Sequence, residues 1–370
     1  MSTHISKHVI SKSRRSTLKS MSMLPIVGYG LLSLYDEVKA ATTASCTLAP
    51  TLTEGPYWVD EKLNRADITT DTTRASVRNG LPLSLAITVF NASNGSCSAD
   101  PVPNVQVDIW HCDAAGEYSD ATGNGQSSTK GQTFLRGYQF SDASGVVNFK
   151  TIYPGWYGGR ATHIHVRMRG YDTAGTLSYN FTTQLFFDDS ITDKVYALAP
   201  YNAKGTRDKR NSNDMHYNSV STPILVTLTE NANAGYAGDV AIALPNLPSS
   251  VLANRFSIAT VATGSTNVPT LTSTLKLPAA DVGTNGSIYV AAAVGENWYF
   301  NNGQSWQAHA LATNSNFPAF YSGTLASSQS FVILSGIDVS AIRGSNIYLG
   351  YGQNALHMVQ KGQYAKTYTL

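Results

Sequence analysis

The stretch Thr151–Arg169 constrains this chain more than any other, because a Pro-Gly turn leads there into a strand whose two faces differ. The β-branched and aliphatic residues after the turn favour an extended conformation. Successive side chains of a strand point to opposite faces, so alternate residues from Ile164 to Met168 form an apolar face, while His163 and His165 share the other. The stretch therefore predicts a strand that buries one face and carries two imidazoles on the other.

Similar runs recur along the chain, separated by turns that contain Gly, Asn or Asp, and few segments show a helical pattern. Repeated short strands of this kind predict an all-β fold, an antiparallel sandwich or a barrel-like sheet. The segment from Asp188 to Tyr217 is long, polar and charged, and is expected to run as an excursion over the core. The expected strands are residues 83–89, 105–110, 134–140, 146–151, 163–169, 181–187, 223–229, 287–294, 330–334 and 346–351.

A change of composition near Pro245–Ser250 predicts two domains, a division that the 370 residues and the 42% hydrophobic content also favour. We expect a catalytic domain at 46–246 and a second, smaller all-β domain at 252–370, whose role the sequence leaves open. In the second domain, Trp298, Tyr299 and Trp306 are candidates for an aromatic binding platform, but such a hairpin more often buries its aromatic rings in its own core.

Residues 1–40 have the pattern of an export signal, with basic residues before an apolar stretch at Met21–Tyr35. The pair Arg14-Arg15 resembles a twin-arginine signal, and an ordinary secretory signal is the alternative. The apolar stretch is short and interrupted by Pro25, so no membrane span is expected in the mature protein. A net charge of +2 without a basic run gives no case for nucleic-acid binding.

The chain has three cysteines, which allows one disulfide and one free thiol in an oxidising compartment. Cys97 precedes the expected strand 105–110 and Cys112 follows it, so the two lie on the order of 20 Å apart at ~3.3 Å per residue. We therefore expect Cys46 to pair with Cys112.

Several separated blocks resemble, in the same order, those of the intradiol ring-cleavage dioxygenases, especially the exported branch of that family. The resemblance covers about residues 46–240 and leaves the tail from 252 outside. The blocks are Thr53–Tyr57, Asp108–Ser119, Thr151–Tyr157, Arg160–His165 and Thr183–Phe187.

The resemblance implies a mononuclear non-haem iron(III) ion and a catechol-type substrate that reacts with dioxygen. The ring would be cleaved between its two hydroxyl-bearing carbons to give a cis,cis-muconate-type diacid. The implied metal ligands are Tyr118, Tyr157, His163 and His165. Tyr157 would be the ligand that leaves when the substrate binds.

The resemblance also places Arg160 and Gln184 beside the substrate ring, where a fixed cation and an amide stabilise developing charge. Pro56, Tyr57 and Trp156 are candidate walls of the substrate pocket. His111 and Glu54 match no ligand position, and we interpret both as structural.

Two other readings use the same residues. A His-x-His pair also occurs in zinc and copper sites, so a different metalloenzyme is one alternative. An exported β-sandwich that binds or adheres without turnover is the other, in which Trp298 or Trp306 would carry the function.

Overall fold

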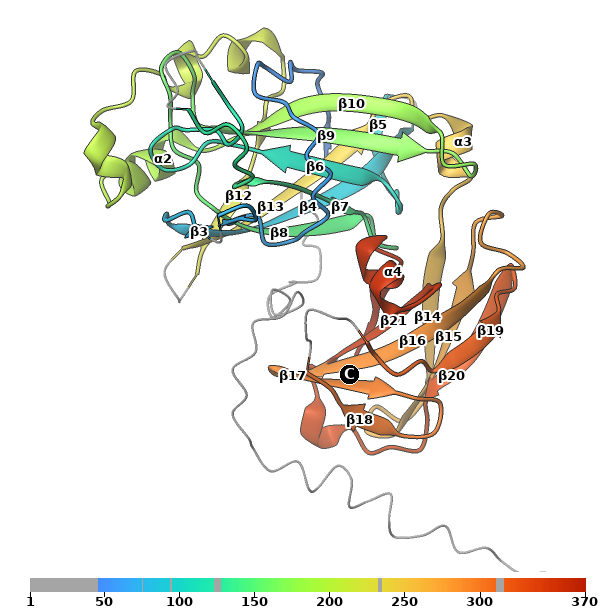
Figure 1. Ribbon diagram of the computed structural model, residues 1–370. Helices are drawn as coiled ribbons and strands as arrows, with labels where there is room; N and C mark the ends of the chain where they lie inside the picture. The colour runs from blue at the N-terminus through green and yellow to red at the C-terminus, as the bar shows by residue number, and fades with distance from the viewer. Residues whose placement is uncertain (1–45, 75, 94, 123–127, 232–234, 311–315) are drawn as a thin grey trace, which may run out of the picture.

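The computed structural model describes residues 46–370 except 75, 94, 123–127, 232–234 and 311–315. The export signal predicted for residues 1–40 lies outside this described part. Figure 1 shows two β-rich bodies, one from the blue to yellow part of the chain and one from the orange to red part. The all-β fold predicted from the sequence is confirmed.

The first body, β1 to β13, is a sandwich of two sheets. One sheet has the order β1-β13-β4-β5, with β8 beside β4 and β12 beside β13; the other has the order β11-β10-β9-β6-β7. The strands of the first sheet are β1 (Thr47–Leu48), β4 (Pro82–Ser93), β5 (Ser96–Pro101), β8 (Val146–Ile152), β12 (Thr227–Glu230) and β13 (Tyr236–Leu244). Those of the second are β6 (Gln106–Trp110), β7 (Arg136–Phe140), β9 (His163–Tyr171), β10 (Leu177–Phe186) and β11 (Ile224–Leu225). A short hairpin, β2 (Thr70–Asp71) and β3 (Ser76–Val77), lies outside both sheets.

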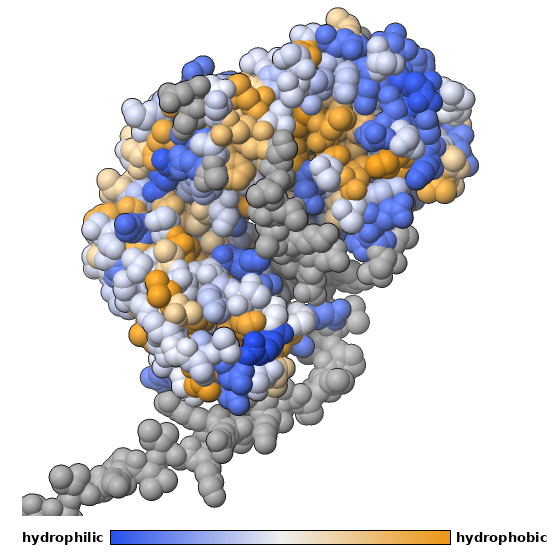
Figure 2. Space-filling view, turned by 180° about the vertical axis from the view of Figure 1, so that it is seen from behind, coloured by the Kyte–Doolittle hydropathy of each residue, from blue (hydrophilic) through white to orange (hydrophobic). Residues whose placement is uncertain are grey.

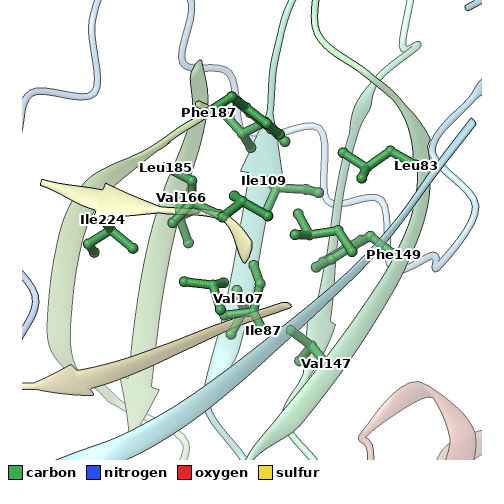
Figure 3. Packing of buried hydrophobic residues seen from close by; sticks show 14 of the residues in the cluster. Leu83, Ile87, Val107, Ile109, Val147, Phe149, Val166, Leu185, Phe187 and Ile224 are labelled. Atoms are coloured by element: carbon green, nitrogen blue, oxygen red, sulfur yellow. The ribbon is translucent and has the colours of Figure 1, made fainter. Parts of the chain in front are cut away.

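The core of this sandwich is built from the apolar faces of strands in both sheets, on which polar and apolar residues alternate. Figure 3 shows Ile87 of β4, Val107 of β6, Phe149 of β8 and Val166 of β9 packed between the sheets. Fully burying such a side chain contributes roughly 1.5–3 kcal/mol, which anchors each strand in its register. The imidazoles of β9 must then lie on the outer face of the second sheet.

The sequence led us to expect antiparallel strands throughout, but some neighbouring strands run parallel. β4 and β13 run parallel over nine residue pairs, from Leu83↔Tyr236 to Asn91↔Leu244. Parallel neighbours need a long crossover connection. The excursion after β10, with α2 (Asp189–Tyr196) and the short helices η1 (Tyr201–Lys204), η2 (Asn211–Asn213) and η3 (Tyr217–Ser219), is part of the chain that connects the two strands.

The second body is a smaller sandwich that follows α3 (Ser249–Leu252). Its sheets have the orders β14-β15-β20 and β18-β17-β16-β21-β22, with β19 beside β16. The outer face of the larger sheet packs against α4 (Ala355–Gln360). The strands are β14 (Ser257–Gly264), β15 (Pro269–Lys276), β16 (Asn285–Val294), β17 (Asn297–Asn301), β18 (Trp306–Ala308), β19 (Tyr321–Thr324), β20 (Ser328–Leu334), β21 (Asn346–Gly352) and β22 (Tyr364–Thr369), and a short helix, η4 (Ser340–Ile342), precedes β21.

The three aromatic residues considered as a binding platform do not share one face. Trp298 packs beside Tyr348, with ring centroids 5.1 Å apart, in the cluster on the outer face of the sheet. Tyr299 and Trp306 pack instead against the core between the two sheets. All three residues are half-buried, and their rings pack into two separate clusters.

The two sandwiches touch through the turn that follows α4. The Lys361 ammonium lies 4.6 Å from the centre of the Phe140 ring, and Asn64 donates a hydrogen bond to the carbonyl of Gln360. Gly362 has φ +61°, and a Cβ atom there would lie 2.3 Å from the carbonyl oxygen of Phe140. A cavity of about 490 Å³, lined by residues of both bodies, opens beside this contact.

The predicted Cys46–Cys112 disulfide is wrong: Cys46 pairs with Cys97, with Cα atoms 5.7 Å apart. Cys46 directly precedes β1 and Cys97 lies on β5, and both strands belong to the same sheet. Cys112 follows β6 of the other sheet and is buried as a free thiol. The pairing depends on how the segment that begins at Cys46 meets β5, which is distant in sequence, and the spacing of the cysteines alone does not reveal this.

Within the described part of the chain, no helix has both the length and the apolar character needed to cross a membrane. On the face shown in Figure 2, hydrophobic residues form patches interspersed with hydrophilic ones.

Candidate active site

The two histidines of β9 meet at their Nε2 atoms, which lie 3.0 Å apart. The Nδ1 atom of His163 is 2.7 Å from the carbonyl oxygen of Ala161 and donates to it, so the Nε2 lone pair faces the site. The ring of His165 stacks on that of Trp110, with centroids 4.8 Å apart. The alternation read from the sequence is confirmed, because Ile164 on the opposite face is fully buried in the core.

Two phenol groups lie close to the Nε2 atom of His163. The hydroxyl oxygens of Tyr118 and Tyr157 each lie 3.5 Å from Nε2 of His163. Tyr118 is fully buried, whereas Tyr157 is half-buried. The structure thus brings together the four side chains that the sequence singled out as metal ligands.

The loops that carry the two tyrosines are packed backbone against backbone. Gly116 has φ +83°, and a Cβ atom there would lie 2.0 Å from the carbonyl oxygen of Trp156. The Asp113 carboxylate closes the first loop by accepting hydrogen bonds from the backbone N–H groups of Ala115 and Glu117. This close approach sets the distance between the phenols, whose ring centroids are 5.6 Å apart.

Arg136, a residue that the sequence did not single out, fixes the backbone next to Tyr118. It is almost fully buried, and its guanidinium donates to the hydroxyl and carbonyl oxygens of Ser119 and to the carbonyl oxygen of Tyr57. The Tyr57 ring in turn stacks on Tyr118. One cation therefore fixes the backbone on both sides of the stacked pair.

The chemistry of the four groups fits a metal ion with a high positive charge. Burial lowers the pKa of His163 to about 3 and that of His165 well below its usual value, so both imidazoles are neutral and offer lone pairs. Burial raises the pKa of Tyr157 to about 12 and that of Tyr118 well above its usual value. Phenols in such surroundings ionise only beside a strong cation.

The spacing fits as well. Two nitrogen ligands held at about 2.1 Å from one ion, at about a right angle, would lie about 3.0 Å apart. Within the described residues no group of three or more His, Cys, Asp or Glu side chains could hold a metal. The candidate centre instead combines two imidazoles with two phenols, a donor set suited to a ferric ion.

Arg160 lies at the edge of this cluster and is held by three groups. Its Nε atom donates to Asp214 at 2.8 Å, and one terminal nitrogen donates to Oε1 of Gln184 at 2.6 Å. The other terminal nitrogen is 3.4 Å from Nε2 of His163. Gln184 completes the arrangement by donating to the carbonyl oxygen of Thr53 at 2.9 Å.

Asp214 is a second residue beside the candidate site that sequence reasoning missed. It belongs to the polar excursion after β10, and no local pattern signals that it meets a residue 54 positions earlier. Its complete burial together with an arginine partner is visible only in the fold.

The predicted pocket residues occupy different environments. Pro56 is exposed, Tyr57 is buried beneath the site, and Trp156 is half-buried with the Lys204 ammonium 4.9 Å from its ring. Of these, Trp156 and Pro56 have the exposure of a pocket wall, while Tyr57 packs against the rings of Tyr118 and Tyr157.

The two residues interpreted as structural have structural partners. His111 is fully buried between the hydroxyl of Thr151, 2.7 Å away, and the carbonyl oxygen of Cys112. Glu54 is exposed and pairs with Arg167.

Comparison with known proteins gives a match over most of the first sandwich. Residues 53–225 match the family model described as Dioxygenase. No curated protein sequence matches the chain.

Among solved structures, an intradiol ring-cleavage dioxygenase from Tetranychus urticae is similar, with 26% identity over 55% of this chain and 97% of that chain and a TM-score of 0.47. The dioxygenase domain of a dioxygenase carbohydrate-binding protein fusion from Streptomyces sp. SirexAA-E has 24% identity over 55% of this chain and 100% of that chain, with a TM-score of 0.37. A 3-chlorocatechol 1,2-dioxygenase from Rhodococcus opacus 1CP has 18% identity over 53% of this chain and 72% of that chain, with a TM-score of 0.34.

Proposed function

Residues 53–225 belong to the intradiol ring-cleavage dioxygenase family, and on that premise we propose that the protein is an exported enzyme that cleaves catechol-type rings between their two hydroxyl-bearing carbons. The observation that carries this proposal is the convergence of two neutral imidazoles and two phenols, with Oη–Nε2 distances of 3.5 Å and an Nε2–Nε2 distance of 3.0 Å. The products are cis,cis-muconate-type diacids, in which both atoms of dioxygen end up, so no external reductant is needed.

The cofactor of the proposed enzyme is a mononuclear non-haem iron(III) ion held by Tyr118, Tyr157, His163 and His165. Bound there, iron(III) supplies the Lewis acidity that keeps phenols and catechols ionised at neutral pH and draws electron density from the substrate. His163 is oriented for this role by its hydrogen bond to Ala161, an arrangement typical of histidine ligands.

The two tyrosines have different roles in this proposal. Tyr118 is fully buried and stacked under Tyr57, so it is the permanent ligand. Tyr157 is less buried and sits on a loop at the edge of the site. As the more exposed of the two phenols, it would accept a proton from one of the catechol hydroxyls, which would leave the substrate anionic.

Arg160 and Gln184 hold the substrate ring and stabilise the negative charge that develops on it. Arg160 is prearranged for this by its contacts to Asp214 and Gln184, so little reorganisation accompanies the reaction. Trp156 and Pro56 are proposed as walls that orient the ring.

Export remains part of the proposal. The predicted signal in residues 1–40 supports it, and so does the Cys46–Cys97 disulfide, because such bonds persist in oxidising compartments. Fractionating cells that produce the full chain, and sequencing the N-terminus of the exported form, tests this point.

The activity is tested by oxygen uptake with catechol, together with iron analysis and a visible spectrum recorded before and after catechol is added without oxygen. Iron(III) bound by tyrosinate gives a broad charge-transfer band, which shifts when catechol binds. Tyr157→Phe and His163→Ala should abolish uptake, while the matched controls Tyr138→Phe and His357→Ala, outside the site, should retain it. A protein that stays colourless after iron loading and consumes no oxygen contradicts the proposal and points to a binding protein; bound zinc or copper points to a different metalloenzyme.

A further inference from the structure

Asp214 is a buried carboxylate whose two oxygens are both occupied by donors. One oxygen accepts hydrogen bonds from Nε of Arg160 at 2.8 Å and from the backbone N–H of Ala161 at 2.7 Å. The other accepts from the backbone N–H groups of His216 and Tyr217 at 2.8 and 2.9 Å. Both oxygens of the side chain must therefore accept hydrogen bonds. An ionised carboxylate does this, because it carries no proton of its own to donate.

The electrostatics of the pair agree with an ionised carboxylate. Burial opposes ionisation, yet the Arg160 guanidinium and the backbone N–H groups hold the pKa of Asp214 below its usual value. Among the described residues, Asp214 is the carboxylate that pairs with Arg160. A largely buried guanidinium without a carboxylate partner would be strongly disfavoured, because no other charge would offset the cost of removing it from water.

The contacts of Asp214 reach the site by two routes. The first route is Arg160, which binds Asp214 and also contacts Gln184 and the Nε2 atom of His163. Through Ala161 the contacts of Asp214 reach the other side of His163, because the Ala161 carbonyl accepts from the Nδ1 atom of that histidine. A segment that follows β10 therefore fixes both a predicted substrate contact and the loop leading to a predicted ligand.

We infer that Asp214 is a positioning residue that acts through Arg160: it aims the guanidinium at the substrate site, and the excursion after β10 thereby completes that site. This role rests on the proposed function for the chemistry that Arg160 serves. The hydrogen bond itself does not depend on turnover, so it can be tested separately.

The first test is the NMR signal of the Arg160 Nε–H group in the full chain loaded with gallium(III), a diamagnetic ion with the charge of iron(III). Arg160→Lys assigns the signal by removing it. In the wild-type chain the Nε–H proton should exchange slowly with water, because it is buried in a charge-assisted hydrogen bond. A proton that exchanges as fast as that of an exposed arginine overturns the inference, whether or not any variant folds.

The second test compares two Asp→Asn variants from the same excursion. Asp193→Asn is the control, because Asp193 also pairs with arginines, Arg207 and Arg210, but within the described part of the chain it has no hydrogen bond or ion pair with Arg160 or its loop. Asp214→Asn should remove the slowly exchanging Arg160 signal, whereas Asp193→Asn should retain it. Loss of the signal in both variants, or in neither, contradicts a specific role for Asp214.

The third test is a double-mutant cycle on kcat/KM for catechol, with iron content measured for each variant. Asp214→Asn should lower kcat/KM about 10- to 100-fold per bound iron, since a displaced catalytic group costs up to about 100-fold. Because Asp214 acts through Arg160, adding Asp214→Asn to Arg160→Ala should cost less than about 3-fold more. Independent, multiplicative effects of the two substitutions would overturn the inference.

The two proposals fail in different ways. If the wild-type chain consumes no oxygen with catechol, the proposed function fails, and the NMR comparison still decides whether Asp214 positions Arg160. If the wild-type chain is active but Asp214→Asn keeps its kcat/KM and its Arg160 signal, only the role of Asp214 fails.

Discussion

The rings of Tyr57 and Tyr118 lie 4.4 Å apart, centre to centre, with their planes inclined by 16°. Tyr57 lies between β1 and β2, and Tyr118 lies on the loop after β6, so the stack joins two segments that are distant in sequence. Arg136 holds both segments by their backbone carbonyls. The position of the buried phenol is thus set by a cation that does not touch its hydroxyl.

Replacing Arg136 by Met should therefore destabilise the first sandwich. The change removes the Arg136 donor from two buried carbonyl oxygens, whereas the Ser119 hydroxyl keeps its hydrogen bond to the carbonyl of Phe134. Each buried group that loses its donor costs about 1–3 kcal/mol. We expect the free energy of unfolding to fall by about 2–5 kcal/mol in urea titrations. The control Arg74→Met removes an exposed arginine and should change it by less than about 0.5 kcal/mol. Equal effects of the two substitutions would show that the buried contacts contribute nothing.

The disulfide is expected to link Cys46 to Cys97 in the oxidised protein, with Cys112 free. Peptide mapping without reduction tests the connectivity, and a linked peptide containing Cys112 would refute it. Because the bond closes a loop with a sequence separation of 51, Cys97→Ser should lower the free energy of unfolding by about 4 kcal/mol, by the chain-entropy relation. Reductant should have a similar effect on the wild-type protein and little on the variant.

Acid should destabilise the protein partly through His111. Burial lowers the pKa of His111 to about 4 in the folded protein, while an unfolded histidine titrates near about 6.5. The folded pKa is depressed, so the unfolded chain binds the proton more tightly, and stability is lost as the pH falls from about 6.5 to about 4.

We expect this group to account for about 2–3 kcal/mol of the loss between pH 7 and pH 4.5. Unfolding in urea at both pH values, compared between wild type and His111→Gln in the same metal state, measures the contribution. The variant should lose less stability than the wild type on acidification. An identical loss in both would mean that His111 is not the group that titrates.

The contact between the two sandwiches should depend on Gly362. Gly362→Ala introduces a Cβ atom 2.3 Å from the carbonyl oxygen of Phe140, in addition to the strain of a positive φ. Gly344→Ala is the matched control, because Gly344 also has a positive φ, +84°, but has nothing within 4 Å of a Cβ atom. Both variants should lose about 1 kcal/mol from strain.

Only Gly362→Ala should also loosen the docking of the second sandwich. Small-angle scattering should then show a larger radius of gyration, and proteases should cut faster between the two sandwiches. If the two variants behave alike, the turn after α4 does not hold the sandwiches together.

Much of this molecule follows from local sequence. The alternation in Thr151–Arg169 and in the runs near 83–89 and 105–110 determined the strands, because which face of a strand is apolar depends only on neighbouring residues. The same alternation put His163 and His165 on one face. The order of the sequence blocks indicated the family and the four candidate ligands.

The tertiary structure decided which distant segments meet. Cys46 pairs with Cys97, although the two are far apart in the sequence, and β4 lies parallel to β13, a strand from the far end of the first sandwich. Arg136 and Asp214 look like ordinary charged residues until folding buries Arg136 beside Ser119 and Asp214 beside Arg160. Periodicity records which face of a strand is apolar, but the partner of a buried charge depends on the packing of whole sheets and loops, which no local pattern contains.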